Sequence, residues 1–69
     1  MNSTMTLGAH LRRLRAARGL SQAEAADSIG ISQTSLSGYE RGTAQMPFTV
    51  AVLLADFYGV SVDDLAEVV

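Results

Sequence analysis

Several residue types are scarce in this chain of 69 residues, which has no cysteine, no tryptophan, no lysine and only one proline. The absence of cysteine excludes a disulfide framework and a thiolate metal site. The single histidine, His10, has no cluster of carboxylates near it, so we expect it on a helix surface and expect no metal or other cofactor. No apolar run approaches the ~20 residues that a membrane-spanning helix needs. The first ten residues also lack the basic region and apolar stretch of a signal peptide, so the sequence predicts a cytoplasmic protein without a membrane partner.

Size and composition indicate one small globular domain that covers residues 1–69. Hydrophobic residues make up 48% of the chain and charged residues 17%, a balance that argues against intrinsic disorder. A domain of this length has little volume for a substrate cleft. The sequence also contains no glycine-rich phosphate loop and no pair of acids tied to a pocket. We therefore expect no enzymatic activity and no small-molecule ligand.

The charges are distributed unevenly along the chain, whose formal net charge is −2. Residues 1–42 contain all five arginines and three acids, whereas residues 43–69 contain four acids and no base. A small domain polarised in this way can present a positive face to a polyanion although it is acidic overall. The arginines are equally consistent with a solvated helix face, so charge alone leaves both interpretations open.

The apolar residues recur at helical spacing throughout, and no segment shows the clean alternation of a strand. Five helices are predicted: Leu7–Arg18, Gln22–Ile29, Gln33–Arg41, Phe48–Tyr58 and a last helix that begins after Ser61. Only three residues separate the second helix from the third, so residues 21–42 are predicted to form a helix-turn-helix unit. The predicted fold class is therefore all-α, a compact five-helix bundle with this unit at its centre.

Polar side chains predict where these helices begin. The expected N-caps are Thr6, Ser21, Ser32 and Ser61. Glu24 and Asp64 stand three residues after two of these serines, which is the spacing of a reciprocal capping box. Glycines at the expected helix ends favour the left-handed conformation that closes a helix.

Apolar stripes predict which residues fill the core. On the third helix the stripe is Leu36 with Tyr39, and Glu40 stands at its edge, where the carboxylate would need a cationic partner. On the fourth helix we expect a core stripe of Val50, Leu53, Leu54 and Phe57. The last apolar residues either close the core over the first and fourth helices or form a contact between two copies of the chain. These residues are Leu65, Val68 and Val69.

The opposite side of the third helix is small and polar. On a wheel of ~100° per residue it contains Gln33, Thr34, Ser37, Gly38 and Arg41. A narrow side without acids fits the major groove of DNA, where the first turn of a recognition helix reaches base edges. The amide of Gln33 can both donate to and accept from adenine, and Gly38 would let the backbone come close. The same residues are also consistent with an ordinary solvent-facing surface.

Three short segments at the start, middle and end of the helix-turn-helix unit stand at a specific spacing. They are Gly19-Leu20-Ser21-Gln22, Gly30-Ile31-Ser32 and Tyr39-Glu40-Arg41-Gly42. Further matching positions are Leu11, Arg15, Ala26, Leu36, Pro47, Leu54, Tyr58-Gly59-Val60-Ser61 and Asp64-Leu65. On these residues the chain, from Leu7 to about Leu65, resembles the Xre/Cro-type helix-turn-helix domain of bacterial and phage repressors, which has the lambda-repressor-like fold.

The resemblance implies roles for individual residues, with the third helix as the recognition helix. The expected base contacts are Gln33, Thr34, Ser37 and Gly38, and the expected phosphate contacts are Gln22, Ser32, Arg41 and Thr43. Arg15 and Glu40 match a pair that forms an ion pair between the first and third helices. Ala25 stands where the family usually has leucine, and we expect Phe48, Val52 or Met46 to fill the resulting space.

The resemblance also implies a function, that of a sequence-specific DNA-binding transcriptional regulator. We expect a small Cro-like repressor that acts by operator occupancy on the nucleoid of a bacterial or phage-infected cell. Its partner would be double-stranded DNA with an inverted repeat, bound by a homodimer. The alternative is a protein–protein adaptor of the same fold that does not bind DNA, which the net negative charge favours.

Overall fold

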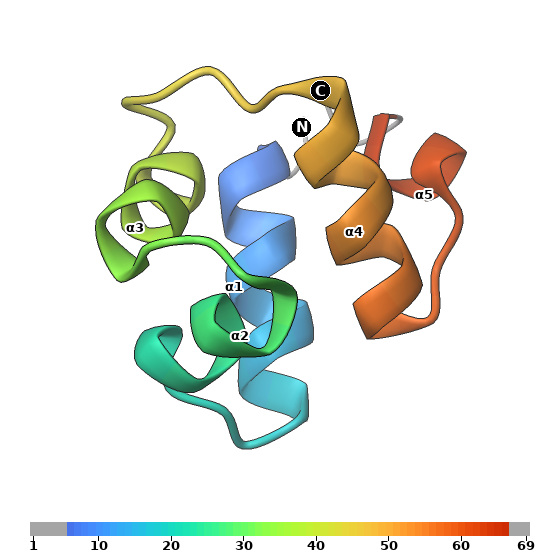
Figure 1. The fold of residues 1–69 in the computed structure, drawn as a ribbon. Helices are drawn as coiled ribbons and strands as arrows, with labels where there is room; N and C mark the ends of the chain where they lie inside the picture. Colours follow the sequence, from blue (N-terminus) through green and yellow to red (C-terminus); the bar gives the residue numbers. More distant parts are fainter. Residues whose placement is uncertain (1–5, 67–69) are drawn as a thin grey trace, which may run out of the picture.

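The computed structural model describes residues 6–66, which form five α-helices joined by short loops (Figure 1). The helices are α1 (Leu7–Ala17), α2 (Gln22–Ile29), α3 (Gln33–Arg41), α4 (Phe48–Tyr58) and α5 (Val62–Ala66). The predicted all-α fold is confirmed, and α1 ends one residue earlier than expected because Arg18 is its C-cap. Within residues 6–66, no helix combines the length and apolar character needed to cross a bilayer.

The helix ends form as the caps predict. The side chains of Thr6, Ser21 and Ser32 each accept a hydrogen bond from the backbone N–H three residues later. The Ser21 box is complete, since the Ser21 N–H donates to Glu24 Oε1 at 2.8 Å, and Ser61 exchanges the same pair of bonds with Asp64. These bonds satisfy backbone donors that would otherwise lack partners at the helix starts.

The core is built mainly from leucines that different helices contribute. Leu11, Leu36, Leu54 and Leu65 are fully or almost fully buried and come from α1, α3, α4 and α5. On α4 the prediction for Leu53 is wrong, since its side chain is 46% exposed. Ala55 and Tyr58 are buried beside Leu54 in its place. Because α4 is apolar on nearly all sides, its periodicity does not distinguish the buried side from the exposed one.

Ala25 on α2 stands where the related domains usually have leucine, so the packing around α2 differs from what a leucine would give. Ala25 and Ala26 are fully or almost fully buried, so α2 is covered closely at these positions although their side chains are small. Phe48 and Val52 do not fill the space of a leucine side chain, because they are 72% and 41% exposed. Phe48 instead borders an apolar cavity of about 300 Å³ between α1, α4 and α5. Met46, the third residue expected to fill that space, is half-buried against the core and lines the same cavity as Phe48.

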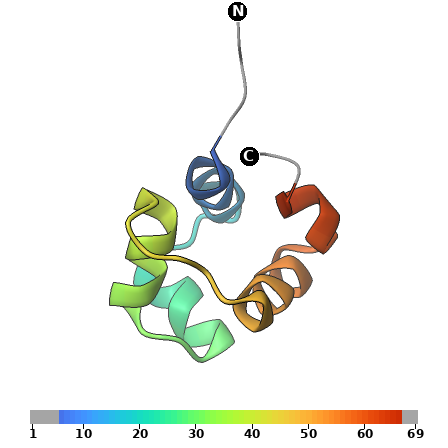
Figure 2. The ribbon, with the colours of Figure 1, turned by 90° about the horizontal axis from the view of Figure 1, so that it is seen from above.

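Helix α1 packs against α3 on one side and α5 on the other, α2 packs against α3 and α4, and α4 packs against α5 (Figures 1 and 2). Helix α3 therefore lies at the edge of the bundle, and within residues 6–66 one of its sides is left exposed and is called the free side of α3 below. At the other edge Leu65 is 2% exposed, which agrees with the core-closing alternative for this residue. Val68 and Val69 lie outside the described residues.

Gly8 allows α1 to approach the end of α3 at backbone distance. A Cβ atom at this position would lie 2.8 Å from the carbonyl oxygen of Tyr39 and closer still to that of Glu40. Real Cβ atoms do not approach that closely, so only glycine fits here without a shift of one helix. Nothing in the sequence pattern marks this contact.

We predict that Gly8→Ala destabilises the protein by about 1–3 kcal/mol, because overpacking forces α1 and α3 apart. Helix propensity alone predicts the opposite sign, since alanine is favoured over glycine by up to about 1 kcal/mol in a helix. Urea unfolding followed by circular dichroism measures the difference, with Ala9→Gly at the neighbouring exposed position as a measure of local propensity. A Gly8→Ala variant as stable as the parent would contradict the close approach.

Candidate nucleic-acid interface

The free side of α3 presents small polar side chains. Gln33 and Thr34 are exposed in its first turn, Ser37 is half-buried one turn later, and Arg41 is exposed at its end. The first turn begins at Ser32, whose hydroxyl accepts the Ser35 N–H at 3.0 Å. The structure thus brings three of the four expected base contacts together on one side of one helix.

The position of Gly38 differs from the expectation, and its placement on the free side is wrong. Gly38 is buried, and a Cβ atom built there would lie 2.9 Å from the Cβ of Ala44. The loop after α3 folds back over the glycine, and its backbone is held there by the Thr43 N–H, which donates to the Gly38 carbonyl at 2.9 Å. The absence of a side chain therefore lets this loop pack closely on α3.

Glu40 is the centre of a buried polar cluster that joins three helices. Its side chain has no exposed surface, and the Arg15 guanidinium holds it through two bonds, Nε to Oε2 at 2.8 Å and Nη2 to Oε1 at 3.0 Å. Gln22 Nε2 donates to Oε1 at 3.0 Å from the first turn of α2. Arg15 Nη1 also donates to the Leu20 carbonyl at 2.8 Å. Arg15, Gln22, Leu20 and Glu40 are called the Glu40 cluster below.

The charges of the Glu40 cluster compensate for its burial. Burial alone would raise the pKa of Glu40, but the hydrogen bonds from Arg15 and Gln22, together with the positive charge of Arg15, outweigh it, so the pKa is lowered from its usual value. The hydrogen bond to Glu40 is likewise the main reason that the pKa of Arg15 is raised. Both groups therefore stay charged at neutral pH, and the carboxylate has the cationic partner that a buried charge requires.

The cluster fixes the geometry of the helix-turn-helix unit. It ties α3 to α1 and to the N-terminus of α2, and the turn between α2 and α3 contains only three residues, which are Gly30, Ile31 and Ser32. The resemblance implies the pair of Arg15 with Glu40, and the structure brings these residues together. The bond from Gln22 to Glu40 has no signal in the sequence, because it joins two side chains that are 18 residues apart. The bond from Arg15 to the backbone carbonyl of Leu20 spans only five residues and holds the start of the loop after α1.

Each of the expected phosphate contacts already makes a hydrogen bond within the protein. Arg41 Nε donates to the Ser37 carbonyl at 3.3 Å, and Thr43 Oγ1 donates to the Gly38 carbonyl at 3.4 Å. The rest of the Arg41 guanidinium is exposed, as are Ser32 and Thr43. Gln22 is half-buried and uses one amide hydrogen for Glu40, which leaves the second hydrogen for another acceptor.

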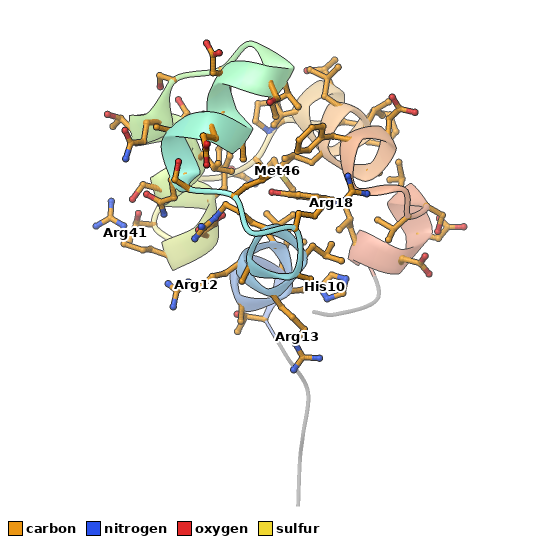
Figure 3. All side chains as sticks on the ribbon, turned by 90° about the horizontal axis from the view of Figure 1, so that it is seen from below. His10, Arg12, Arg13, Arg18, Arg41 and Met46 are labelled. Atoms are coloured by element: carbon orange, nitrogen blue, oxygen red, sulfur yellow. The ribbon has the colours of Figure 1, made fainter. Side chains whose placement is uncertain are left out.

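Neither a metal nor a catalytic group is assigned to this surface. In the part of the chain that the structure describes, no three or more of the residues His, Asp and Glu gather into a group that would hold a metal ion. His10 is half-buried on α1 and lies away from the free side of α3 (Figure 3).

Comparison with known proteins agrees with this arrangement. A family model described as a helix-turn-helix domain matches residues 6–68. An uncharacterised HTH-type transcriptional regulator of Bacillus subtilis strain 168, YobD, is 43% identical over 53 residues, which are 77% of this chain and 47% of that protein. The cryptic phage CTXphi transcriptional repressor RstR of Vibrio cholerae is 38% identical over 57 residues, which are 83% of this chain and 51% of RstR. The chain thus spans about half the length of the curated relatives that it matches.

Solved structures show the same fold. The restriction-modification controller protein C.AhdI of Aeromonas hydrophila superposes with a TM-score of 0.80 at 32% identity, over 86% of this chain and 89% of C.AhdI. The clp gene regulator ClgR of Corynebacterium glutamicum superposes with a TM-score of 0.81, also at 32% identity, over 90% of this chain and 66% of ClgR. Both likenesses extend over nearly all of the described helices.

We predict that Arg15→Ala lowers the free energy of unfolding by about 3–5 kcal/mol, because it leaves the Glu40 carboxylate buried without a cation. Arg13→Ala is the matched control, since Arg13 is an exposed arginine of the same helix and its loss is expected to change stability by less than about 0.5 kcal/mol. Thermal and urea unfolding measure both variants. Equal stability of the two variants would remove the cluster from the account.

The lowered pKa of Glu40 also predicts a pH dependence. The unfolded chain protonates Glu40 near its usual pKa of 4.5, while the folded protein keeps it ionised to lower pH. Its contribution is therefore complete above pH 4.5 and is lost as the pH falls through the lowered folded value. Glu40→Gln should reduce the slope of stability against pH between about 5 and 3. An identical slope in the variant and the parent would contradict the assignment.

Proposed function

We propose, from the premise that the chain belongs to the helix-turn-helix domain family, that it is a sequence-specific DNA-binding transcriptional regulator. The observation that carries the proposal is the free side of α3, which is held rigidly from behind and presents exposed Gln33 and Thr34 in its first turn. In this proposal α3 enters the major groove, and its first turn meets the base edges.

In this proposal, the exposed side chains of α3 determine which bases the protein prefers. Gln33 would form two hydrogen bonds with an adenine, and the Thr34 methyl group would contact a thymine methyl group. Ser37, which is half-buried, would make a less discriminating contact with a neighbouring base. Gly38 is no longer proposed as a base contact, since Ala44 covers it.

Backbone phosphates would be held at both ends of the helix-turn-helix unit. Ser32 and the second amide hydrogen of Gln22 would contact phosphates near the N-termini of α3 and α2, where helix dipoles favour an anion. Arg41 and Thr43 would contact a phosphate at the other end of α3. The small number of cationic contacts predicts a modest affinity with a shallow salt dependence.

Two copies on an inverted repeat would give the specificity that one copy lacks. A helix of nine residues is about 13 Å long and therefore faces only about four base pairs. A site that short occurs by chance about once in a few hundred positions, so a single copy would find many competing sites in a genome. We propose a homodimer on DNA whose two α3 helices lie about one helical turn, ~34 Å, apart.

The proposed mechanism is repression by occupancy of an operator. RstR is a phage transcriptional repressor, and its match with this chain covers the whole helix-turn-helix unit and most of the remaining helices. The chain therefore acts, in this proposal, as a Cro-like repressor that excludes other proteins from the DNA that it covers. The proposed place of action is the nucleoid of a bacterial or phage-infected cell.

Selection from a pool of random duplexes tests the function and the role of Gln33 together. The parent protein is expected to enrich one short motif in inverted-repeat arrangement. Gln33→Ala should lose the preference at one position of each half-site, at a cost of about 1–3 kcal/mol, while nonspecific binding remains.

Thr49→Ala serves as the control, because Thr49 is an exposed polar residue on α4, away from α3. It is expected to enrich the same motif as the parent. A pool that shows no enrichment with the parent at low salt would favour the adaptor alternative. If Gln33→Ala enriches the same motif as the parent, the protein binds DNA, but the first turn of α3 does not determine its sequence preference.

A further inference from the structure

Arg12 lies on the side of α1 that faces α3, although it has no assigned role in the interface. Gly8, one turn earlier, touches the backbone of α3, and Arg15, almost one turn later, pairs with Glu40. At ~100° per residue, Arg12 points about 40–60° from these two residues, at the edge of the contact between α1 and α3. Its side chain is exposed there.

The other exposed arginines of α1 point elsewhere. In Figure 3, Arg12 and Arg41 lie on the same side of the molecule, next to α3, whereas Arg13 points away from the bundle. Arg18 packs over the rings of Phe57 and Tyr58, with its guanidinium carbon 5.7 Å and 5.9 Å from the ring centres. Arg12 is therefore the one exposed arginine of α1 that flanks the proposed DNA-binding surface.

The positive charge of Arg12 has no carboxylate bonded to it in the part of the chain that the structure describes. Its positive charge acts on the Glu40 carboxylate, whose bonds are already taken up by Arg15 and Gln22. Within residues 6–66 Arg12 forms no ion pair with an acid, since the pair of Arg15 with Glu40 is the one present there. The Arg12 guanidinium is thus available for a ligand, and its planar fork matches the geometry of phosphate oxygens.

We propose that Arg12 binds a DNA phosphate adjacent to the one held by Arg41. This inference rests on the proposed function and extends it, because it makes α1 a part of the DNA-binding surface. With this contact, the phosphates of one DNA strand would be bound by α1 as well as by the end of α3. It would add affinity without sequence preference.

The dependence of affinity on salt tests the proposal, since each phosphate neutralised contributes about 0.9 to the slope of log K against log salt concentration. The selected duplex is titrated by fluorescence anisotropy at several NaCl concentrations with the parent, Arg12→Ala and Arg13→Ala. Because the inverted repeat binds two copies of the chain, Arg12→Ala should reduce the slope by about 1.8, which is about 0.9 for each copy, so that between about 50 and 200 mM NaCl it loses about twelvefold less affinity than the parent does. Arg13→Ala should retain the parent slope, and Arg12→Lys should restore it, because lysine keeps the charge.

The outcomes separate this inference from the proposed function. If the parent binds the duplex and the two alanine variants have equal slopes, Arg12 makes no phosphate contact, and the regulator assignment stands. A loss of slope in Arg13→Ala alone overturns the inference in the same way. If the parent binds no duplex at any salt concentration, both proposals fail. Circular dichroism melts of the variants provide the check on folding, and Arg12→Gln replaces Arg12→Ala if the latter melts early.

Discussion

The structure depends above all on the buried carboxylate of Glu40. A charge with no exposed surface is costly in a domain of this size, whose total stability is on the order of 3–10 kcal/mol. It is tolerated because Arg15 and Gln22 together make three hydrogen bonds to its two oxygens. These bonds have strict geometry, so they allow only one arrangement of α1, α2 and α3. Gly8 completes this arrangement, since it lets α1 come within backbone distance of the same end of α3.

Because of this constraint, the two sides of α3 have different roles. Leu36 and Glu40 face inward and hold the helix, while Gln33 and Thr34 face outward and make no contribution to the core. A surface that is rigid before it binds loses little conformational entropy on binding. This compensates in part for the low positive charge of a chain whose net charge is −2 and whose phosphate contacts are few.

Local signals in the sequence were sufficient to predict the helices. The caps at Ser21 and Ser61, and the glycines that end α2 and α3 with φ of 79° and 78°, act within a few residues of the chain. Positions that depend on contacts between elements were harder to predict. The pattern misplaces Leu53 because α4 is apolar almost all round, and it misplaces Gly38 because the loop directly after α3 folds back over the glycine at Thr43 and Ala44.

In the candidate site, too, the sequence predicts the features that belong to a single helix and misses the contacts between helices. The periodicity of α3 placed Gln33, Thr34 and Ser37 on one side, because that property belongs to a single helix. The pair of Arg15 with Glu40 came from the resemblance to the Xre/Cro-type domain, and the bond from Gln22 to Glu40 came only from the structure. The periodicity of the third helix indicates that Glu40 needs a cationic partner, but it cannot indicate that Gln22 on another helix also bonds it, because that contact arises only from the packing of the helices.

The most direct test of a preformed, DNA-reading α3 is a map of NMR shift changes on addition of the selected duplex to ¹⁵N-labelled protein. The account predicts the largest changes at the amides of Gln33 and Thr34 and in the loop at residues 42–44. It predicts that the Nε–H resonance of Arg15 stays in place, because the Glu40 cluster is formed before DNA binds. Dominant changes around Phe48 and Leu53 on α4, or an Arg15 resonance that moves as much as the α3 amides, would contradict it.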